Sequence, residues 1–381
     1  MQRMLYDADH GVFRASVVEF LSREVWPHVD QHADDKVLPR ELWLAAGQQG
    51  YLGLGVPEEY GGSAAGDYRF NAVLIEELAK VNMALASSLS IHFDVVAPYL
   101  VNLTTEEQRL RWLPGFATGE IVTAIGMTEP SAGSDLAALR TTAARAEGGW
   151  LLTGSKTFIT NGYSADLVVV AARTSPEKKA HGITLFGVEA TMPGFSRGRR
   201  LDKVGQPEAD TAELFFEDVF VPDENVIGGV DQGFILMMQG LPQERLGAAV
   251  ANLAHARQIL TETIGYARER IAFGTAIGSF QHNKFLLAEL ATKADVTQAF
   301  VDECVVAHNR GELTPVDAAK AKWWTAQVQN DLLDHCLQLH GGYGYMNEYR
   351  VARAWRDARV TKIWAGSNEI MKELVGRELG L

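Results

Sequence analysis

Glu244 and Arg245 stand side by side in the stretch Leu-Pro-Gln-Glu-Arg-Leu, residues 241–246. A carboxylate can act as a general base, and a guanidinium can bind an anionic group. The stretch follows an apolar segment, residues 234–238, and precedes a long helical pattern. Pro242 and Glu244 also suit the first turn of a helix, where a missing donor costs nothing and an acid meets the positive end of the dipole. Taken alone, the stretch favours this structural interpretation over a catalytic one.

Two further stretches whose residues could bind a ligand lie at the ends of predicted strands. The first is Met-Thr-Glu-Pro-Ser-Ala-Gly-Ser-Asp, residues 127–135, whose small and hydroxyl-bearing residues would let a ligand approach backbone donors. The second is Phe-Ile-Thr-Asn-Gly, residues 158–162, with an aromatic ring and a hydroxyl before an Asn-Gly turn. A Pro/Gly turn and a β-hairpin are the structural alternatives, although a hairpin does not require Thr160 in particular.

Two more stretches lie in the C-terminal part. One is Arg-Glu-Arg-Ile-Ala-Phe-Gly, residues 268–274, followed by Phe280 and Gln281. Basic residues near the C-terminus of a helix favour its dipole, which is the structural alternative here. The other is Gln-Leu-His-Gly-Gly-Tyr-Gly-Tyr, residues 338–345. Its adjacent glycines would let backbone amides meet a diphosphate, whereas a helix C-cap accounts for one glycine alone.

Composition narrows the classes of protein to consider. A net charge of −13 argues against nucleic acid and anionic membrane as main partners. Cys304 and Cys336 form no disulfide framework and no metal-binding spacing, so we expect both in the core. We expect no apolar run that approaches the ~18 residues of a membrane span. Residues 1–10 contain Asp7 and Asp9 and no apolar centre, so we expect no signal peptide and a cytoplasmic, bacterial-type protein.

The elements that must position these stretches follow a helical, β, helical order. Apolar residues with helical spacing predict helices, and short β-branched or aromatic runs between Gly, Pro, Asn and Asp predict strands. Thr104 or Thr105 is expected to cap a helix. His92 and Asp94 are expected to be satisfied interior or edge groups and not ligands. No GxGxxG opens a helix, so a Rossmann fold has no support. The predicted helices cover residues 13–21, 41–50, 70–81, 87–103, 107–113, 247–268, 286–308 and 316–339. The predicted strands cover residues 121–126, 150–153, 156–159, 167–172, 183–189 and 212–219.

The stretches, in this order and on this plan, resemble the acyl-CoA dehydrogenase flavoenzymes over essentially the whole chain. Arg-Asp-Ala-Arg (residues 356–359) and Ala-Gly-Ser-Asn-Glu (365–369) complete a specific set. The likeness is greatest to the long-chain acyl-CoA dehydrogenases, through residues 241–246, 210–218 and 368–374. The resemblance implies an α+β multidomain fold. It would have an N-terminal helical domain (1–120), a middle β-barrel-like domain (121–229) and a C-terminal four-helix bundle (230–381).

The resemblance also implies FAD as cofactor, held by three groups of residues. The group expected to line the flavin ring consists of Ile125, Met127, Thr128, Ser134, Phe158 and Thr160. Many relatives have tryptophan in place of Phe158. The group expected to hold the diphosphate and adenosine consists of Arg270, Phe273, Gln281, Gln338, Gly341 and Gly342. In the family this second group comes from a neighbouring subunit, which implies an obligate dimer within a homotetramer, a dimer of dimers. Ser367 and Glu369 would close over the same cofactor.

The resemblance assigns the catalytic base to Glu244. Many relatives carry the base in the C-terminal motif, as Glu-Gly-Thr, where this chain has Ala365, Gly366 and Ser367. Alanine cannot take a proton. A subset of the family, including the long-chain and isovaleryl enzymes, carries the base at the position that matches Glu244. The departure at Ala365 and the presence of Glu244 therefore explain each other.

The reaction implied is dehydrogenation of an acyl-CoA thioester to a trans-2-enoyl-CoA in fatty-acid β-oxidation. Glu244 would take the α-proton while the β-hydrogen leaves as hydride to flavin N5, and electrons would pass to an electron-transferring flavoprotein. A backbone N–H and a flavin ribityl hydroxyl would stabilise the thioester oxygen. The expected substrate-binding residues are Ser134, Arg245, Ala365 and Gly366. A water-poor pocket should raise the pKa of Glu244.

Other functions remain open at this point. A branched short-chain, isovaleryl-type dehydrogenase would share the base position. An oxidase would pass electrons to O₂. A catalytically retired flavin- or CoA-binding scaffold is suggested by Ala365 and opposed by Glu244 with Arg245. For Arg245 the structural alternative is a surface arginine.

Overall fold

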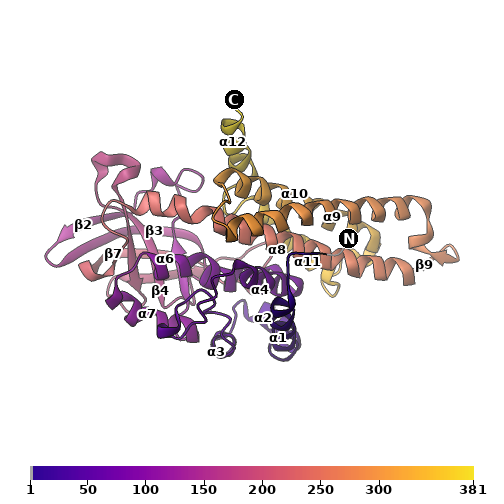
Figure 1. The fold of residues 1–381 in the computed structure, drawn as a ribbon, viewed down its shortest axis with the longest axis horizontal. Coiled ribbons are helices and arrows are strands. Elements are labelled where there is room, and N and C mark those ends of the chain that lie inside the picture. Colours follow the sequence, from indigo (N-terminus) through magenta and orange to yellow (C-terminus); the bar gives the residue numbers. More distant parts are fainter. Residues whose placement is uncertain (1–2) are drawn as a thin grey trace.

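The computed structural model describes residues 3–381, and the chain runs through helices, a sheet and helices again (Figure 1). The first two residues of the segment for which we expect no signal peptide lie outside this description. The N-terminal helices are α1 (Ala8–Glu24), α2 (Val29–Asp35), α3 (Arg40–Gln48), α4 (Tyr68–Val81), α5 (Met83–Ser90), α6 (Ala97–Asn102) and α7 (Glu106–Thr118). Thr105 caps α7 through a reciprocal pair of hydrogen bonds with Gln108, as its sequence predicts.

A π-helical turn, Ile91–Val96, joins α5 to α6 without a break. Residues Met83–Asn102 therefore form one helical stretch of 20 residues, and its most apolar window has a mean hydropathy of 1.4. By length and composition this stretch could cross a membrane, so the expectation that no apolar run approaches a span is wrong. Within the fold, 72% of that window is buried, which is the environment of a core helix.

The middle part is an eight-stranded sheet. Its strands are β1 (Thr123–Gly126), β2 (Thr142–Ala146), β3 (Gly149–Thr160), β4 (Leu167–Arg173), β5 (Ile183–Glu189), β6 (Phe195–Arg200), β7 (Thr211–Pro222) and β8 (Val226–Ile227). The strands are paired in the order β6-β7-β3-β2-β4-β5-β8, and β1 pairs with β4 in parallel. Residues 150–153 and 156–159, expected as separate strands, are one strand, β3, with register shifts against β7.

The C-terminal part is a helical bundle. It contains α8 (Gly233–Glu269), α9 (Gln281–Asn309), α10 (Pro315–His340), α11 (Arg350–Ala358) and α12 (Asn368–Glu378). Helix α10 packs against each of the other four, and α4 of the N-terminal part packs along α8. A short hairpin, β9 (Ile271–Ala272) and β10 (Thr275–Ala276), lies at the end of the bundle remote from the sheet, while α12 projects from its side (Figure 1).

Helix α8 begins much earlier than its sequence suggests. Pro242 and Glu244 were expected in a first turn, but the helix starts at Gly233 and contains Pro242 in its interior. A proline there removes one backbone donor. The preceding residues stay helical because they pack into the core, where Met237 is fully buried. The interpretation of Glu244 as an acid near the helix dipole is therefore wrong.

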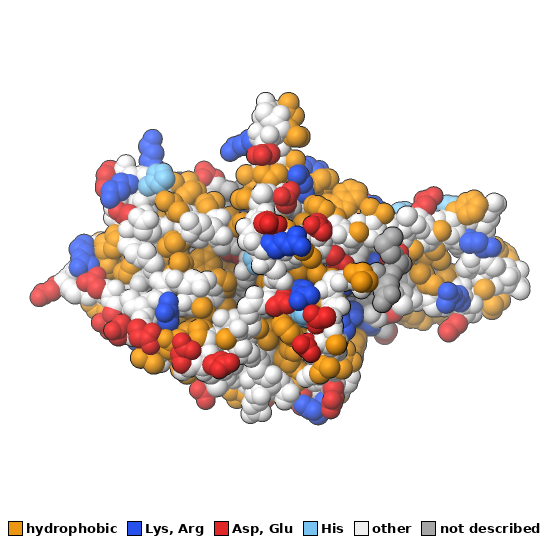
Figure 2. Space-filling view, in the orientation of Figure 1, with side chains coloured by type: hydrophobic (Ala, Val, Ile, Leu, Met, Phe, Trp, Pro, Cys, Tyr) orange, Lys and Arg blue, Asp and Glu red, His pale blue; other side chains and the backbone are white. Residues whose placement is uncertain are grey.

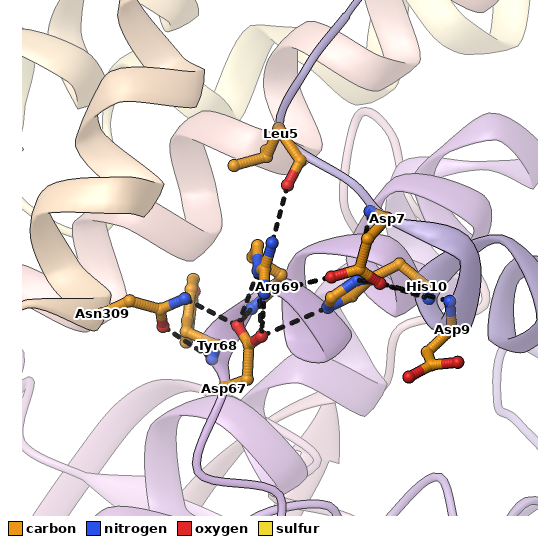
Figure 3. A network of polar contacts seen from close by, with 8 residues as sticks. All are labelled: Leu5, Asp7, Asp9, His10, Asp67, Tyr68, Arg69 and Asn309. Carbon is orange, nitrogen blue, oxygen red and sulfur yellow. Dashed lines mark hydrogen bonds and ion pairs between the residues drawn. The ribbon is translucent and has the colours of Figure 1, made fainter.

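A polar network ties the start of the chain to the bundle (Figure 3). Arg69 donates to Asp67 at 2.6 Å and to the carbonyl of Leu5 at 3.1 Å. Asn309 of α9 donates to Asp67 and accepts a hydrogen bond from the backbone N–H of Tyr68 at 2.8 Å. This network fixes the first turn of α4, and with it the position of the Tyr68 side chain. Elsewhere on the face drawn in Figure 2, acidic and basic side chains are scattered among apolar ones.

Candidate active site

Glu244 lies in the first third of α8, and its side chain is half-buried. Burial raises the pKa of this carboxyl to about 7, the charge of Asp94 acts in the same direction, and Tyr99 and Arg245 act against it. A carboxyl that titrates near neutral pH is suited to taking and releasing protons. The expectation that the surroundings of Glu244 raise its pKa agrees with this geometry.

Tyr99 of α6 is the direct partner of Glu244. Its hydroxyl donates a hydrogen bond to Oε1 of Glu244 at 3.1 Å, and its ring is 2% exposed. Gly240, one turn before Glu244, leaves room for the pair. A Cβ at Gly240 would lie 2.8 Å from the tyrosine oxygen and 3.3 Å from Oε1 of Glu244. Sequence reasoning did not find Tyr99, because only the fold brings α6 beside α8.

A second buried carboxyl, Asp94, lies in the π-helical turn beside the same part of α8. It accepts hydrogen bonds from Tyr68 (3.2 Å), Asn71 (3.0 Å) and Gln243 (3.2 Å). Burial raises the pKa of Asp94 to about 6, and the three hydrogen bonds limit the rise. The helix opposite has Gly247 at this point, where a Cβ would meet Oδ2 of Asp94 at 2.3 Å. Asp94 is thus a satisfied interior group, as expected.

His92, in the same π-helical turn, is also a satisfied interior group. Its ring stacks on Phe116 and bonds the carbonyl oxygen of that residue at 3.0 Å. Its other ring nitrogen lies 2.9 Å from the hydroxyl of Thr123 on β1. Burial lowers the pKa of His92 to about 3, so the ring stays neutral and ties the turn to the sheet.

Arg245 is buried, with 6% of its surface exposed. The alternative of a surface arginine is therefore wrong. Within the part of the chain that the structure describes, its Nε has no hydrogen-bond partner. One terminal nitrogen lies 4.0 Å from the point where a Cβ on Gly366 would be. The structure thus places Arg245 beside the turn formed by Ala365 and Gly366.

The group predicted to line the flavin ring comes together where strands β1 and β3 end. Ile125 is in β1 and Met127 follows it, while Phe158 and Thr160 end β3. The backbone N–H of Thr157 donates to the carbonyl of Thr128 at 2.9 Å, which joins the two stretches. Phe158 has a positive φ of 59° and is 69% exposed, so its ring stands at the surface beside them. Ser134 lies in the exposed loop that follows Thr128.

The ion pair of Lys156 and Glu129 joins β3 to the chain that follows β1. Lys156 is fully buried, and its Nζ bonds Oε1 of Glu129 at 2.8 Å and the carbonyl of Met127 at 3.3 Å. The carboxylate of Glu129 also accepts from the backbone N–H groups of Arg140 and Thr141. The chain between β1 and Glu129 is therefore fixed against β3.

The group predicted to hold the diphosphate lies elsewhere, at the hairpin end of the bundle (Figure 1). Arg270, Gln338, Gly341 and Gly342 line one cavity of about 420 Å³. The guanidinium of Arg270 lies over the ring of Tyr343, 5.5 Å from its centroid. Open space surrounds both glycines, so their backbone can be approached. A guanidinium beside bare backbone fits a diphosphate.

The remaining predicted residues lie at the edges of these groups. Phe273, in the hairpin, is 96% exposed, and Gln281 is exposed at the start of α9. Ser367 caps α12, with its hydroxyl accepting from the backbone N–H of Ile370 at 3.4 Å. Glu369 is exposed in the first turn of α12, where backbone and Ser367 hydrogen bonds lower its pKa. Within one chain, the flavin-ring group therefore lies at the sheet, whereas Arg270 and Phe273 lie at the hairpin, at the end of the bundle remote from the sheet (Figure 1).

Comparison with known proteins assigns this fold to a family. Three models of acyl-CoA dehydrogenase domains match the chain: the N-terminal domain over residues 7–120, the middle domain over 124–219 and the C-terminal domain over 231–380. The crystal structure of acyl-CoA dehydrogenase from Geobacillus kaustophilus superposes with a TM-score of 0.98 at 43% identity, covering 100% of both chains. The fold thus defines the class of protein, an acyl-CoA dehydrogenase.

Two named relatives are similar to this chain over nearly its whole length. The long-chain specific acyl-CoA dehydrogenase of Rattus norvegicus mitochondria is 45% identical over 99% of this chain and 88% of its own length. The isovaleryl-CoA dehydrogenase of Solanum tuberosum mitochondria is 35% identical over 99% of this chain and 92% of its own. The chain belongs to the acyl-CoA dehydrogenase family and is an oxidoreductase of that class.

Proposed function

We propose that this enzyme dehydrogenates a fatty acyl-CoA between Cα and Cβ, giving a trans-2-enoyl-CoA, with FAD as cofactor and Glu244 as base. The observation that carries the proposal is the environment of Glu244. Its carboxyl is half-buried, bonded by Tyr99 and titrates near neutral pH, while Ala365 offers no carboxyl at the C-terminal motif. A general base contributes about 100–10,000-fold to a rate, which a charge beside a helix dipole does not.

The residues of the chain divide the chemistry among them. Glu244 takes the α-proton, and a pKa near 7 lets it do so without holding the proton too tightly afterwards. The backbone N–H of Ala365, beside Gly366, donates to the thioester oxygen, where negative charge develops as the α-proton leaves. Ser134 and Arg245 complete the substrate site. When bound, FAD supplies the acceptor for the β-hydrogen, as a hydride at N5.

The cofactor is shared between two copies of the chain. Ile125, Met127, Thr128, Phe158 and Thr160 face the flavin ring, with Ser134 nearby and Ser367 and Glu369 over the cofactor. Arg270, Phe273, Gln281, Gln338, Gly341 and Gly342 of a second copy hold the diphosphate and adenosine. The separation of the two groups within one chain supports this division (Figure 1). A cofactor site built from two copies requires a dimer, and two such dimers form the proposed homotetramer.

The proposal places the enzyme in β-oxidation, with an electron-transferring flavoprotein as acceptor. The identity to the long-chain relative supports a long acyl chain. The isovaleryl relative supports a second candidate, a branched short acyl-CoA, because the position of Glu244 suits both. The cytoplasmic location stays a prediction from the sequence, since the two relatives are described as mitochondrial.

The test is an anaerobic titration of the purified yellow protein with acyl-CoAs of graded length and branching. We expect straight long-chain acyl-CoAs to bleach the flavin absorption, and the enoyl product to be recovered. Bleaching by isovaleryl-CoA alone would favour the second candidate. Rapid peroxide formation in air would indicate an oxidase. Binding of every acyl-CoA without bleaching would contradict the proposed function.

A further inference from the structure

A second buried cation lies beside the turn of Ala365 and Gly366. Lys322 of α10 has no exposed surface, and its Nζ donates a hydrogen bond to the carbonyl oxygen of Gly366 at 2.5 Å. Among the ion pairs of residues 3–381, none joins Lys322 to a carboxylate within 4.0 Å. An ammonium buried without a paired carboxylate costs stability, so its retention calls for a reason.

The charges around Lys322 come from two other helices. They are Arg245 of α8, which is also buried, and Glu369 of α12, which is exposed. Burial, followed by the nearby Arg245, lowers the pKa of Lys322 to about 7, and Glu369 opposes the change. Two buried cationic side chains thus meet at one turn of the chain.

The turn itself has an unfavourable backbone. Ala365 has a φ of 50° and Gly366 a φ of 86°, so two consecutive residues are left-handed, and the first is not a glycine. Gly366 also packs tightly, because a Cβ there would lie 2.5 Å from Cε of Met371. A turn of this kind persists only when its surroundings hold it. The hydrogen bond from Lys322 to the carbonyl of Gly366 holds this turn in place.

We propose that Lys322 is a positioning residue for the dehydrogenation. By holding the carbonyl of Gly366, it fixes the turn so that the backbone N–H of Ala365 faces the thioester oxygen. This inference rests on the proposed function, which assigns that N–H to the thioester. A preorganised donor stabilises the developing enolate charge more than a mobile one does.

The test uses the FAD-loaded enzyme with two substitutions of Lys322 and one matched control. Lys322→Met removes the ammonium and keeps most of the side-chain length. Lys322→Gln keeps an N–H donor without the charge. Lys320→Met is the control, because Lys320 lies on the same helix, is partly exposed and pairs with Asp317 at 3.1 Å.

We expect Lys322→Met to lower kcat by about 10–100-fold with a much smaller change in KM, since a misplaced donor is felt in the transition state. Lys322→Gln should recover part of the loss, and Lys320→Met should match the wild type. Unchanged kcat in Lys322→Met, or a loss confined to KM, would overturn the inference.

A second readout isolates proton abstraction from turnover. In a 3-thia-acyl-CoA, sulfur replaces the β-carbon, so the α-proton can leave but no β-hydride can follow. The enolate bound beside FAD is followed by its long-wavelength absorption at saturating ligand. We expect a smaller enolate fraction in Lys322→Met than in the wild type. An equal fraction would show that Lys322 does not position the donor.

The two proposals fail in different ways. A wild-type protein that is neither bleached by acyl-CoA nor able to form the enolate would contradict the proposed function itself. An active wild type with equally active Lys322 variants would overturn the role of Lys322 alone. FAD content and near-ultraviolet circular dichroism report folding. If neither variant folds or keeps FAD, Lys322 is a structural residue and the positioning role is withdrawn.

Discussion

At the scale of single residues, the carboxyl of Glu244 is the group on which turnover should depend. Glu244→Gln keeps the shape of the side chain and a partner for Tyr99 but cannot accept a proton. We expect the variant to keep its fold and FAD while kcat falls by about 100–10,000-fold. The measurement is single-turnover bleaching with the best acyl-CoA, beside the FAD content. Near-normal bleaching would remove the assignment of the base.

Tyr99 should set the pH range of the enzyme. Its hydroxyl donates to the carboxylate of Glu244 and so lowers the pKa of Glu244, which burial has raised to about 7. In Tyr99→Phe that pKa rises, the carboxylate form becomes scarcer below neutral pH, and the acidic limb of kcat/KM moves to higher pH. A hydrogen bond to a charged group predicts a move of about one pH unit.

A matched control for Tyr99→Phe is available in the same chain. Tyr60 also donates to a carboxylate, Glu106, at 2.6 Å, but outside the candidate site. Tyr60→Phe should leave the acidic limb of kcat/KM where it is in the wild type. An acidic limb that stays in place in Tyr99→Phe, or moves to lower pH, would show that the hydroxyl does not act on the base.

Sequence reasoning found the residues whose types and neighbours in the chain are distinctive. Glu244, Arg245 and the turn at Ala365 belong to short recognisable stretches. Tyr99 and Lys322 were missed because each acts through a partner far away in the sequence, 145 and 44 positions distant. Such pairings depend on how helices pack, and no local pattern records them.

At the scale of elements, the contact of α8 with the π-helical turn depends on one glycine. Gly247 and Gly265 both lie in α8, but a Cβ at Gly247 would meet Asp94 at 2.3 Å, whereas Gly265 has open space. Gly247→Ala should lower the free energy of unfolding by about 1–3 kcal/mol through overpacking. Gly265→Ala should raise it by up to ~1 kcal/mol through helix propensity.

Urea unfolding of both glycine variants, at one protein concentration and saturating FAD, measures the difference. If the two substitutions change the unfolding free energy equally, then Asp94 is not packed against α8 in solution as described. A loss of stability in Gly247→Ala should be accompanied by a changed pH profile of kcat/KM, because Asp94 acts on the pKa of Glu244.

Element boundaries were predicted well where pattern and packing agree and poorly where they differ. Helices α9 and α10 follow their apolar faces closely. Strands β2 (Thr-Ala-Ala-Arg-Ala) and β6 (Phe-Ser-Arg-Gly-Arg-Arg) were missed because they are largely exposed and poor in β-branched residues. They form because neighbouring strands supply backbone partners. The start of α8 was missed because a proline usually marks a helix boundary.

At the scale of the whole molecule, the division of the predicted FAD site can be tested by mixing inactive variants. One partner is Glu244→Gln, and the other is the double variant Arg270→Ala/Gln338→Ala, which should lose FAD. If each site combines two copies, a mixed dimer contains one intact site. An equal mixture, dissociated and reassembled with FAD, should regain about one quarter of wild-type activity.

The control for this experiment is each variant dissociated and reassembled alone, which should stay inactive. A mixture that also stays inactive, although mixed dimers are present by mass spectrometry, would place the whole site within one chain. The helix–sheet–helix order was predictable from the sequence at this scale, and the family comparison confirms it. The resemblance already implied that Arg270 and Met127 belong to different subunits, and the bundle separates the two residues within one chain.

The exposed hairpin that carries Phe273 would couple FAD binding to dimerisation if the site is shared as proposed. Phe273 is 96% exposed and Ile271 is 59% exposed, so in the proposed dimer a second copy would cover apolar side chains that a single chain leaves in water. FAD binding and dimerisation are then thermodynamically coupled, so each one promotes the other. Diluting the enzyme would then release FAD as well as separate the subunits. A shortage of FAD would in turn leave chains unassembled.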